Sequence, residues 1–322
     1  MQPQFYPELG EQLYRQVLPN GLTVAVVPRP GFSRKIAYFV TDYGSIHTAF
    51  ALDGKQISAP AGVAHYLEHK LFDMPGRDIT AEFAALGANP NAFTSYDMTA
   101  YYFSCTENFE QSLRLLLEFV STPYFTEESV EKEREIIGQE IDMNEDSADT
   151  RVFENLMEAM YRKHPIRKPI LGTRQSIAQI TPQVLYECHK AFYHPGNMLL
   201  CVVGDVDPRQ VVQIAEETLG AVGNCTGQKE TSWQEEMTCP IAIDSYVDNV
   251  TIWKIRKYRS DDYATEFTYD AADWGEHCYN RGEKVQLEDI PRRKGEHISC
   301  WVVDDHTPTN SKDIINWLER RR

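Results

Sequence analysis

The sequence predicts an α+β fold: a largely antiparallel sheet with helices packed on one face, followed by a small C-terminal module. Strand-like segments bracket a central run of helical segments instead of alternating with them one by one, which is typical of an antiparallel sheet covered by helices. With 42% apolar and 25% charged residues over 322 positions, the chain has the composition of a globular protein of one or two domains. It turns polar and rich in turn residues near Gly223, which predicts a domain over residues 1–225 and a linker with a small module over 226–322.

The predicted strands of the first domain are rich in β-branched and aromatic residues. Residues 21–28 (GLTVAVVP) and 35–45 (KIAYFVTDYGS) alternate or run apolar. Residues 91–106 (NAFTSYDMTAYYFSCT) are rich in Thr, Tyr and Phe and are predicted as a strand. Residues 197–206 (NMLLCVVGDV) predict a buried strand that ends in a Gly-Asp turn.

Helical segments occupy the centre of the chain, with one more after the last strand. They are predicted over residues 60–72, 78–88, 108–123, 127–146, 150–164, 181–193 and 207–220. Pro60 lies near the start of the first, and Gly87 ends the second. After the linker, strand-like pieces within 245–258 and 297–305 and a short final helix are predicted in the small module.

The net charge and the cysteines indicate which partners and which cellular compartment to expect. The net charge is −16 and the isoelectric point about 5.0, so no nucleic-acid partner is expected, because phosphate binding needs a basic surface. No apolar run is long enough to predict a membrane span, and the N-terminus does not read as a secretory signal. Seven scattered cysteines without a Cys-x-x-Cys pair predict free thiols in a reducing cytoplasm.

The stretch GVAHYLEHKLF, residues 62–72, carries the first candidate site. On a helix, His65, Glu68 and His69 project from one face, because positions three and four apart are neighbours. Two neutral imidazoles at this spacing can share a zinc ion. The carboxylate beside them could hold a metal-bound water and accept its proton, since the metal lowers the pKa of that water from about 16 toward 7. The alternative without a function is a solvated helix face that contains histidines by chance.

A catalytic zinc needs a third protein ligand, and residues 131–141 (EKEREIIGQEI) offer one. Glu133 and Glu140 are seven positions apart, close to two helical turns, so they share a face. The isoleucines at 136, 137 and 141 are expected on another side, where they would seat the helix in a core. The alternative is that both glutamates are solvated, or paired with Lys132 and Arg134.

Several motifs in order resemble the pitrilysin/insulinase family of zinc peptidases, the inverted zincins. They are GVAHYLEHKLF, the family's metal helix; LGANPNAFTSYDMTAYYF, its active-site edge strand; EKEREIIGQEI, its distal-ligand segment; and YHPGNMLLCVVGDV, the strand that closes its first domain. The resemblance runs from about residue 20 to 220, roughly two-thirds of the chain. It implies the family's fold and a zinc-dependent endopeptidase with one zinc ion per chain.

The resemblance also implies a role for each matching position. His65 and His69 match the two histidine ligands, and Glu140, which lies 71 residues beyond His69, matches the third ligand. Glu68 matches the general base. Glu133 matches a further glutamate near the metal, where it would orient a ligand or tune the water.

The edge strand that receives the substrate backbone is matched by Asn91, Ala92 and Phe93. An exposed strand edge can capture an extended peptide through main-chain hydrogen bonds, which gives affinity that tolerates many sequences. We therefore expect a peptide or unfolded protein as substrate.

Beyond residue 223 the sequence departs from the family. Members carry a second αβ domain and an opposite half that supplies an arginine and a tyrosine, and no equivalent is recognisable here, although Tyr258 and Arg259 are the right residue types. We therefore expect a homologous or complementary half-subunit as partner. The alternative is a non-catalytic or partly active peptidase-fold subunit that binds peptides or a partner.

The C-terminal region has weaker candidates of its own. Ligand-type residues occur in GEHC and GEHISC: His277, Cys278, His297 and Cys300. Their spacing matches no established zinc pattern, so ordinary residues of a small domain are the favoured interpretation. The acidic and histidine positions 304–306 are interpreted in the same way, as a solvated turn.

Overall fold

The structure is a computed structural model that describes residues 3–161, 163–223 and 228–229 and three short strands at 241–243, 251–257 and 300–303. The chain divides into two compact units, which are described separately. One unit is formed by residues 1–144 and 169–230, and the other by residues 145–168 and 231–322. The division predicted at residues 225 and 226 stays a prediction.

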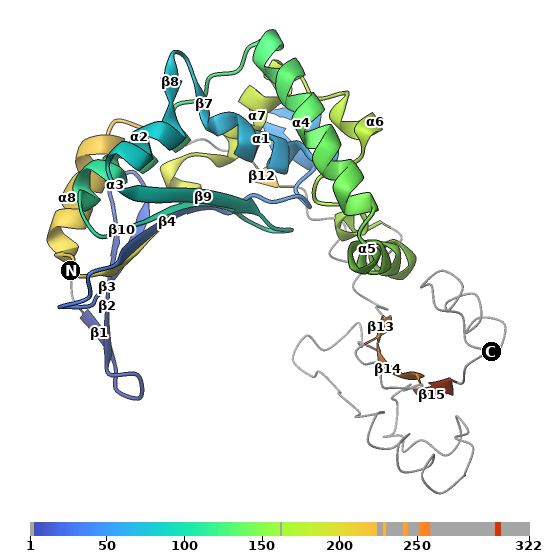
Figure 1. The fold of residues 1–322 in the computed structure, drawn as a ribbon, viewed down its shortest axis with the longest axis horizontal. Coiled ribbons are helices and arrows are strands. Elements are labelled where there is room, and N and C mark those ends of the chain that lie inside the picture. The colour runs from blue at the N-terminus through green and yellow to red at the C-terminus, as the bar shows by residue number, and fades with distance from the viewer. Residues whose placement is uncertain are drawn as a thin grey trace, which may run out of the picture. The chain divides into compact units, whose positions relative to one another are not determined.

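A seven-stranded sheet organises the first unit (Figure 1). Its members are β1 (Pro3–Tyr6), β2 (Glu11–Val17), β3 (Thr23–Pro28), β4 (Lys35–Thr41), β9 (Ala88–Thr94), β10 (Thr99–Cys105) and β11 (Met198–Gly204). They lie in the order β1-β2-β3-β11-β4-β10-β9. Every neighbouring pair is antiparallel except β11 with β3. The largely antiparallel sheet is therefore confirmed.

Helices cover one face of this sheet (Figure 1). They are α1 (Val63–Leu71), α2 (Ile79–Ala85), α3 (Phe109–Ser121), α4 (Glu127–Glu145), α6 (Arg174–Ile177), α7 (Pro182–Phe192) and α8 (Pro208–Leu219). Side chains alternate between the two faces of a strand, and Phe39, Tyr101 and Phe103 are fully buried while Tyr38 and Tyr102 are only half-buried. The prediction that helices pack on one face of the sheet is thus confirmed, and the core lies between that face and the helices.

The segment predicted as one strand over residues 91–106 is instead a hairpin. The strands β9 and β10 pair with each other through a turn in which the N–H of Ser95 donates to the carbonyl of Met98 at 2.7 Å. The turn at residues 95–98 contains Ser95 and Asp97, which favour turns, but it has no Gly or Pro, and the Thr, Tyr and Phe residues on both sides of it dominated the prediction. The hairpin makes β9 the terminal strand of the sheet.

Several short elements of the first unit were not predicted. A small sheet joins β5 (Ala49–Leu52), β6 (Lys55–Ser58) and β12 (Gln228–Lys229), and β7 (Asp73–Met74) pairs with β8 (Arg77–Asp78). One turn of 3₁₀ helix, Pro195–Asn197, precedes β11. β12 lies within the predicted linker, most of which is outside the described residues.

The second unit contains α5 (Ala148–Met160), a 3₁₀ turn (Pro165–Arg167), and a sheet of β13 (Ile241–Ile243), β14 (Thr251–Lys257) and β15 (Cys300–Val303). β14 and β15 confirm the strands predicted within 245–258 and 297–305. The predicted final helix lies outside the described residues. No helix in the described part is long and apolar enough to span a membrane.

Candidate metal centre

The helix that carries the histidine pair is almost entirely buried. α1 begins at Val63, three residues after Pro60, because Gly62 adopts a positive φ of 92° that a helix cannot contain. Tyr66 and Leu67 are fully buried on this helix, and the hydroxyl of Tyr66 donates to the carbonyl of Val130 on α4. Burial on this scale fixes α1 between the sheet and α4, so its polar residues have fixed directions.

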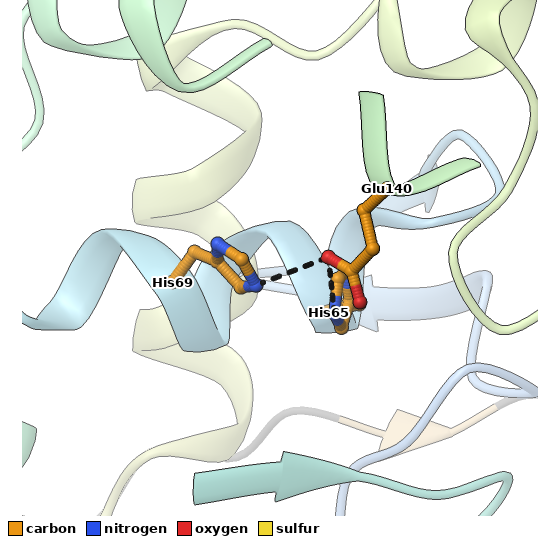
Figure 2. Close-up of side chains that lie close together, drawn as sticks. All are labelled: His65, His69 and Glu140. Carbon is orange, nitrogen blue, oxygen red and sulfur yellow. Dashed lines mark ion pairs between the residues drawn. The ribbon is translucent and has the colours of Figure 1, made fainter. Parts of the chain in front are cut away.

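Three potential metal ligands converge between α1 and α4 (Figure 2). Nε2 of His65 and Nε2 of His69 each lie 3.6 Å from Oε2 of Glu140. One ligand atom from each residue can be chosen so that all three lie within 4.8 Å of one another. Two ligands of a tetrahedral zinc at about 2.0–2.1 Å are themselves about 3.3–3.4 Å apart. The separations therefore fit a shared zinc ion, and two imidazoles with one carboxylate are a zinc-type donor set.

His65 is held in the form that a metal requires. Its side chain is 9% exposed, and burial, with the nearby His69, lowers the pKa of His65 to about 3. The ring is therefore neutral at physiological pH and offers a lone pair. Within the described residues its Nδ1 is a buried atom without a hydrogen-bond partner.

His69 is held by Glu133. Its Nδ1 lies 2.9 Å from Oε1 of Glu133, whose side chain is 17% exposed. Burial would lower the pKa of His69, but the hydrogen bond and the charge of Glu133 outweigh it, so the pKa is raised. A carboxylate that accepts from Nδ1 leaves the lone pair on Nε2, the nitrogen that faces Glu140.

Glu68 lies on the same side of α1 as the histidines, and its carboxylate also contacts the sheet. Its Oε2 accepts a hydrogen bond of 2.6 Å from the hydroxyl of Thr94 on β9. Burial raises the pKa of Glu68, and the Thr94 hydrogen bond opposes that rise. A carboxylate with a raised pKa is a better proton acceptor, which suits a general base. Thr94 was not singled out from the sequence, because no local pattern reveals a contact across 26 residues.

The three predicted substrate-binding residues lie on β9, beside α1. They do not share a face: Asn91 and Phe93 are exposed, while Ala92 alternates with them and is half-buried. The Asn91 side chain accepts from the N–H of Ala92 at 2.8 Å. A peptide strand that added to this edge would compete with Asn91 for that donor.

The predicted arrangement of α4 needs one correction. Ile136 is 45% exposed, so it does not help to seat the helix, whereas Ile137 and Ile141 are buried on the side that Glu133 and Glu140 also face. The glutamates are not paired with their neighbours on α4. Arg134 instead contacts Glu131 and donates to the carbonyl of Ile180 at 3.1 Å.

The remaining sequence candidates belong to the C-terminal region. Tyr258, Arg259, His277, Cys278, His297 and positions 304–306 lie outside the described residues. Cys300 begins β15. In the part of the chain that the structure describes, the group formed by His65, His69 and Glu140 is the cluster with metal-binding geometry.

Comparison with known proteins agrees with this fold and cluster. Residues 56–174 match the family described as insulinase (peptidase family M16), and residues 179–244 match the domain described as the peptidase M16 inactive domain. The fold is that of M16-like peptidases, with a candidate metal centre on its covered face. The chain belongs to the insulinase (M16) peptidase family.

Individual relatives carry similar descriptions. The uncharacterized zinc protease YmfH of Bacillus subtilis is 48% identical over 68% of this chain and 52% of its own length. An uncharacterized zinc protease of Rickettsia felis is 30% identical over 64% of this chain and 49% of its own length. The crystal structure of an M16-like peptidase from Alicyclobacillus acidocaldarius matches with a TM-score of 0.69 and 38% identity, over 75% of this chain and 58% of that one. The chain therefore spans about half the length of the curated relatives it matches.

Proposed function

We propose that this chain carries the metal-binding half of a zinc-dependent endopeptidase that hydrolyses extended peptides, with one zinc ion per chain. The observation that carries the proposal is the convergence of His65, His69 and Glu140, with the carboxylate of Glu68 on the same helix. Two imidazoles, one carboxylate and an adjacent base are the parts that a hydrolytic zinc site needs. The description of the relatives as zinc proteases supports the choice of metal.

Each residue has a role in this mechanism. His65, His69 and Glu140 would hold the ion, and Glu133 would keep His69 in the tautomer with its lone pair on Nε2. A zinc ion held there would supply a Lewis acid for a peptide carbonyl and for a water molecule. Glu68 accepts the proton of the attacking water and delivers it to the leaving amine.

The substrate is proposed to bind as an added strand on β9. A strand at the end of a sheet offers unpaired backbone groups along its free side, and β9 is the terminal strand of the described sheet. The Thr94–Glu68 hydrogen bond ties this strand to the base. A peptide aligned on Ala92 would therefore bring its backbone close to the proposed reaction centre.

A complementary half is proposed to complete the cleft. The residues above come from one side of the substrate, and peptide hydrolysis also needs an opposing wall that excludes water and stabilises the oxyanion. The relatives are about twice as long as the matched region, which supports a further half in the working enzyme. A homologous subunit or a further domain would satisfy this requirement.

A cytoplasmic location is proposed from the cysteines. Cys105, Cys188 and Cys201 are free thiols in the described part of the chain. Free thiols persist most readily in a reducing compartment.

The test is chelator-sensitive hydrolysis. A quenched, unstructured peptide is incubated with the purified chain, alone and with extracts or recombinant homologues that could supply the second half. The proposal predicts cleavage that disappears with a chelator and returns with added zinc. Zinc binding without cleavage under every pairing would favour the alternative, a peptide-binding or partner subunit.

A further inference from the structure

A short segment after α5 contacts both helices that carry the candidate ligands. Residues 171–176, here called the clasp, run from a tight turn into the first residues of α6. On one side the clasp touches the residues that precede α1, and on the other it touches the C-terminal half of α4. No other role assigned above uses these residues.

The contact with α1 is made by two glycines in close approach. A Cβ on Gly62 would lie 2.3 Å from the carbonyl oxygen of Leu171, and a Cβ on Gly172 would lie 2.4 Å from the carbonyl oxygen of Ala61. The two backbones thus leave no room for a side chain on either glycine, and both glycines have positive φ. The hydroxyl of Ser176 donates to the Ala61 carbonyl at 2.8 Å. The start of α1 is therefore held by the clasp.

The contact with α4 is made by Arg174. Its Nε donates to the carboxylate of Asp142 at 2.8 Å, and its Nη2 donates to the other oxygen. Its guanidinium also fills the space beside Gly138, where a Cβ would lie 2.5 Å from Nη1. Gly138 and Asp142 flank Glu140 by two residues on each side. Arg174 therefore grips the turn of α4 that carries the third candidate ligand.

The clasp is also stiff along its own length. The side chain of Thr173 accepts from the N–H of Ser176 at 3.2 Å, and the hydroxyl of Ser176 accepts from the N–H of Thr173 at 2.9 Å. This reciprocal cap fixes the turn that joins Gly172 to Arg174. Gly172, which contacts the segment before α1, and Arg174, which contacts α4, are two residues apart. The clasp therefore keeps the start of α1 close to the C-terminal half of α4.

Among the described residues, the other hydrogen bonds that anchor α4 all lie N-terminal to Glu140, and beside it only the apolar side chains of Ile137 and Ile141 pack into the core. The hydroxyl of Tyr66 contacts the Val130 carbonyl, and Lys70 donates to the Ser129 carbonyl at 3.3 Å. The hydrogen bond nearest to Glu140 in this set is that of Arg134 with the Ile180 carbonyl, six residues or about 9 Å of helix before Glu140. A tilt of only about 5° around that point would move Glu140 by about 0.8 Å, whereas metal–ligand distances tolerate about 0.2 Å.

We propose that the clasp is a positioning element that holds Glu140 at metal-binding distance from the two histidines, with Arg174 as its principal side chain. The inference rests on the proposed metal site but not on any proposed substrate or partner. Arg174 touches neither metal nor substrate in this role. It acts through the placement of α4.

The test measures zinc affinity by competition with a chromophoric chelator, using the full chain. Arg174→Ala is compared with Arg114→Ala, because the Arg114–Glu217 ion pair is similarly exposed but joins α3 to α8. We expect a loss of about tenfold in zinc affinity for Arg174→Ala, as for residues that orient metal ligands, and less than twofold for Arg114→Ala. Arg174→Lys, which keeps the positive charge but has a single donor nitrogen, should recover part of the loss.

A second comparison separates positioning from general stability. In a Glu140→Gln background the third ligand is already impaired, so adding Arg174→Ala should cause little further loss. Asp142→Asn, which keeps the size of the side chain, replaces Arg174→Ala if the alanine variant does not fold. Equal losses in both backgrounds, or wild-type affinity in the single variant, would overturn the proposal. A wild-type chain that binds no zinc would refute the metal site itself, an outcome distinct from failure of the clasp.

Discussion

Nδ1 of His69 lies 2.9 Å from Oε1 of Glu133, so a carboxylate on α4 fixes the orientation of a ring on α1. The other nitrogen of that ring faces Glu140 at 3.6 Å. One imidazole thus contacts two carboxylates seven residues apart on one helix. This arrangement makes the tautomer of His69 a consequence of how α1 and α4 pack.

Glu133→Gln should weaken zinc binding without abolishing it. The amide keeps the size of the side chain but loses the charge that favours a proton on Nδ1 of His69. We expect zinc affinity to fall about tenfold or more, as for other groups that orient metal ligands. Chelator competition measures the change, and Glu135→Gln, an exposed site on the same helix, is the matched control. Equal affinities for the two variants would remove the role assigned to Glu133.

Glu68→Gln should retain the metal and lose hydrolysis. The amide can still accept the Thr94 hydrogen bond, but it cannot take a proton from water. General-base catalysis is typically worth about 100- to 10,000-fold, and we expect kcat to fall within that range while zinc content stays at the wild-type level. Cleavage at the wild-type rate would show that the mechanism stated here is wrong.

Thr94→Val should shift the pH–rate profile. The Thr94 hydroxyl stabilises the charged form of Glu68 and opposes the rise that burial causes in its pKa, so removing the hydroxyl raises that pKa further. A base works deprotonated, and the acidic limb of kcat/KM should therefore move to higher pH. The midpoint of that limb is measured in both proteins with the zinc content matched. If the acidic limb stays in place or moves to lower pH, Thr94 does not lower the pKa of the proposed base Glu68.

The purified chain, as a proven monomer, should be a poor peptidase. Its residues form one side of the proposed cleft, and the other side would supply the group that stabilises the oxyanion. The loss of a positioned oxyanion donor typically lowers the rate about 100- to 1000-fold. Specific activity on unstructured peptides is compared before and after addition of a complementary half. Robust, chelator-sensitive turnover by the monomer alone would lead us to abandon the partner requirement.

Local periodicity predicted much of the frame around the site. The helix that holds the histidine pair was predicted because Val63, Leu67 and Leu71 recur at a spacing of four, and α1 confirms it. The core strands follow from β-branched and aromatic runs. Ile136 was misassigned, because residues adjacent in sequence lie about 100° apart on a helix and periodicity alone did not fix which isoleucine faced inward.

Contacts between distant segments could not be predicted in this way. The Thr94–Glu68 hydrogen bond joins residues 26 apart, and Ser176 contacts Ala61 across 115 residues. Local pattern also gave no reason to pair Glu140 with His65, since only the family resemblance linked the two segments. What the sequence leaves open is therefore the tertiary placement of elements it predicts individually.

Metal content tests the central claim most directly. The zinc-to-protein ratio is measured after exhaustive dialysis of the wild-type chain, His65→Ala, Glu140→Gln and the exposed control Glu135→Gln. The account predicts about one zinc per chain for wild type and control, and a collapse toward zero for the two ligand variants, because a catalytic-type site uses three protein ligands. Full zinc retention in Glu140→Gln would contradict the assignment of the third ligand and direct attention to Glu133. Absence of zinc from the wild-type chain, after reconstitution with the metal, would contradict the account as a whole.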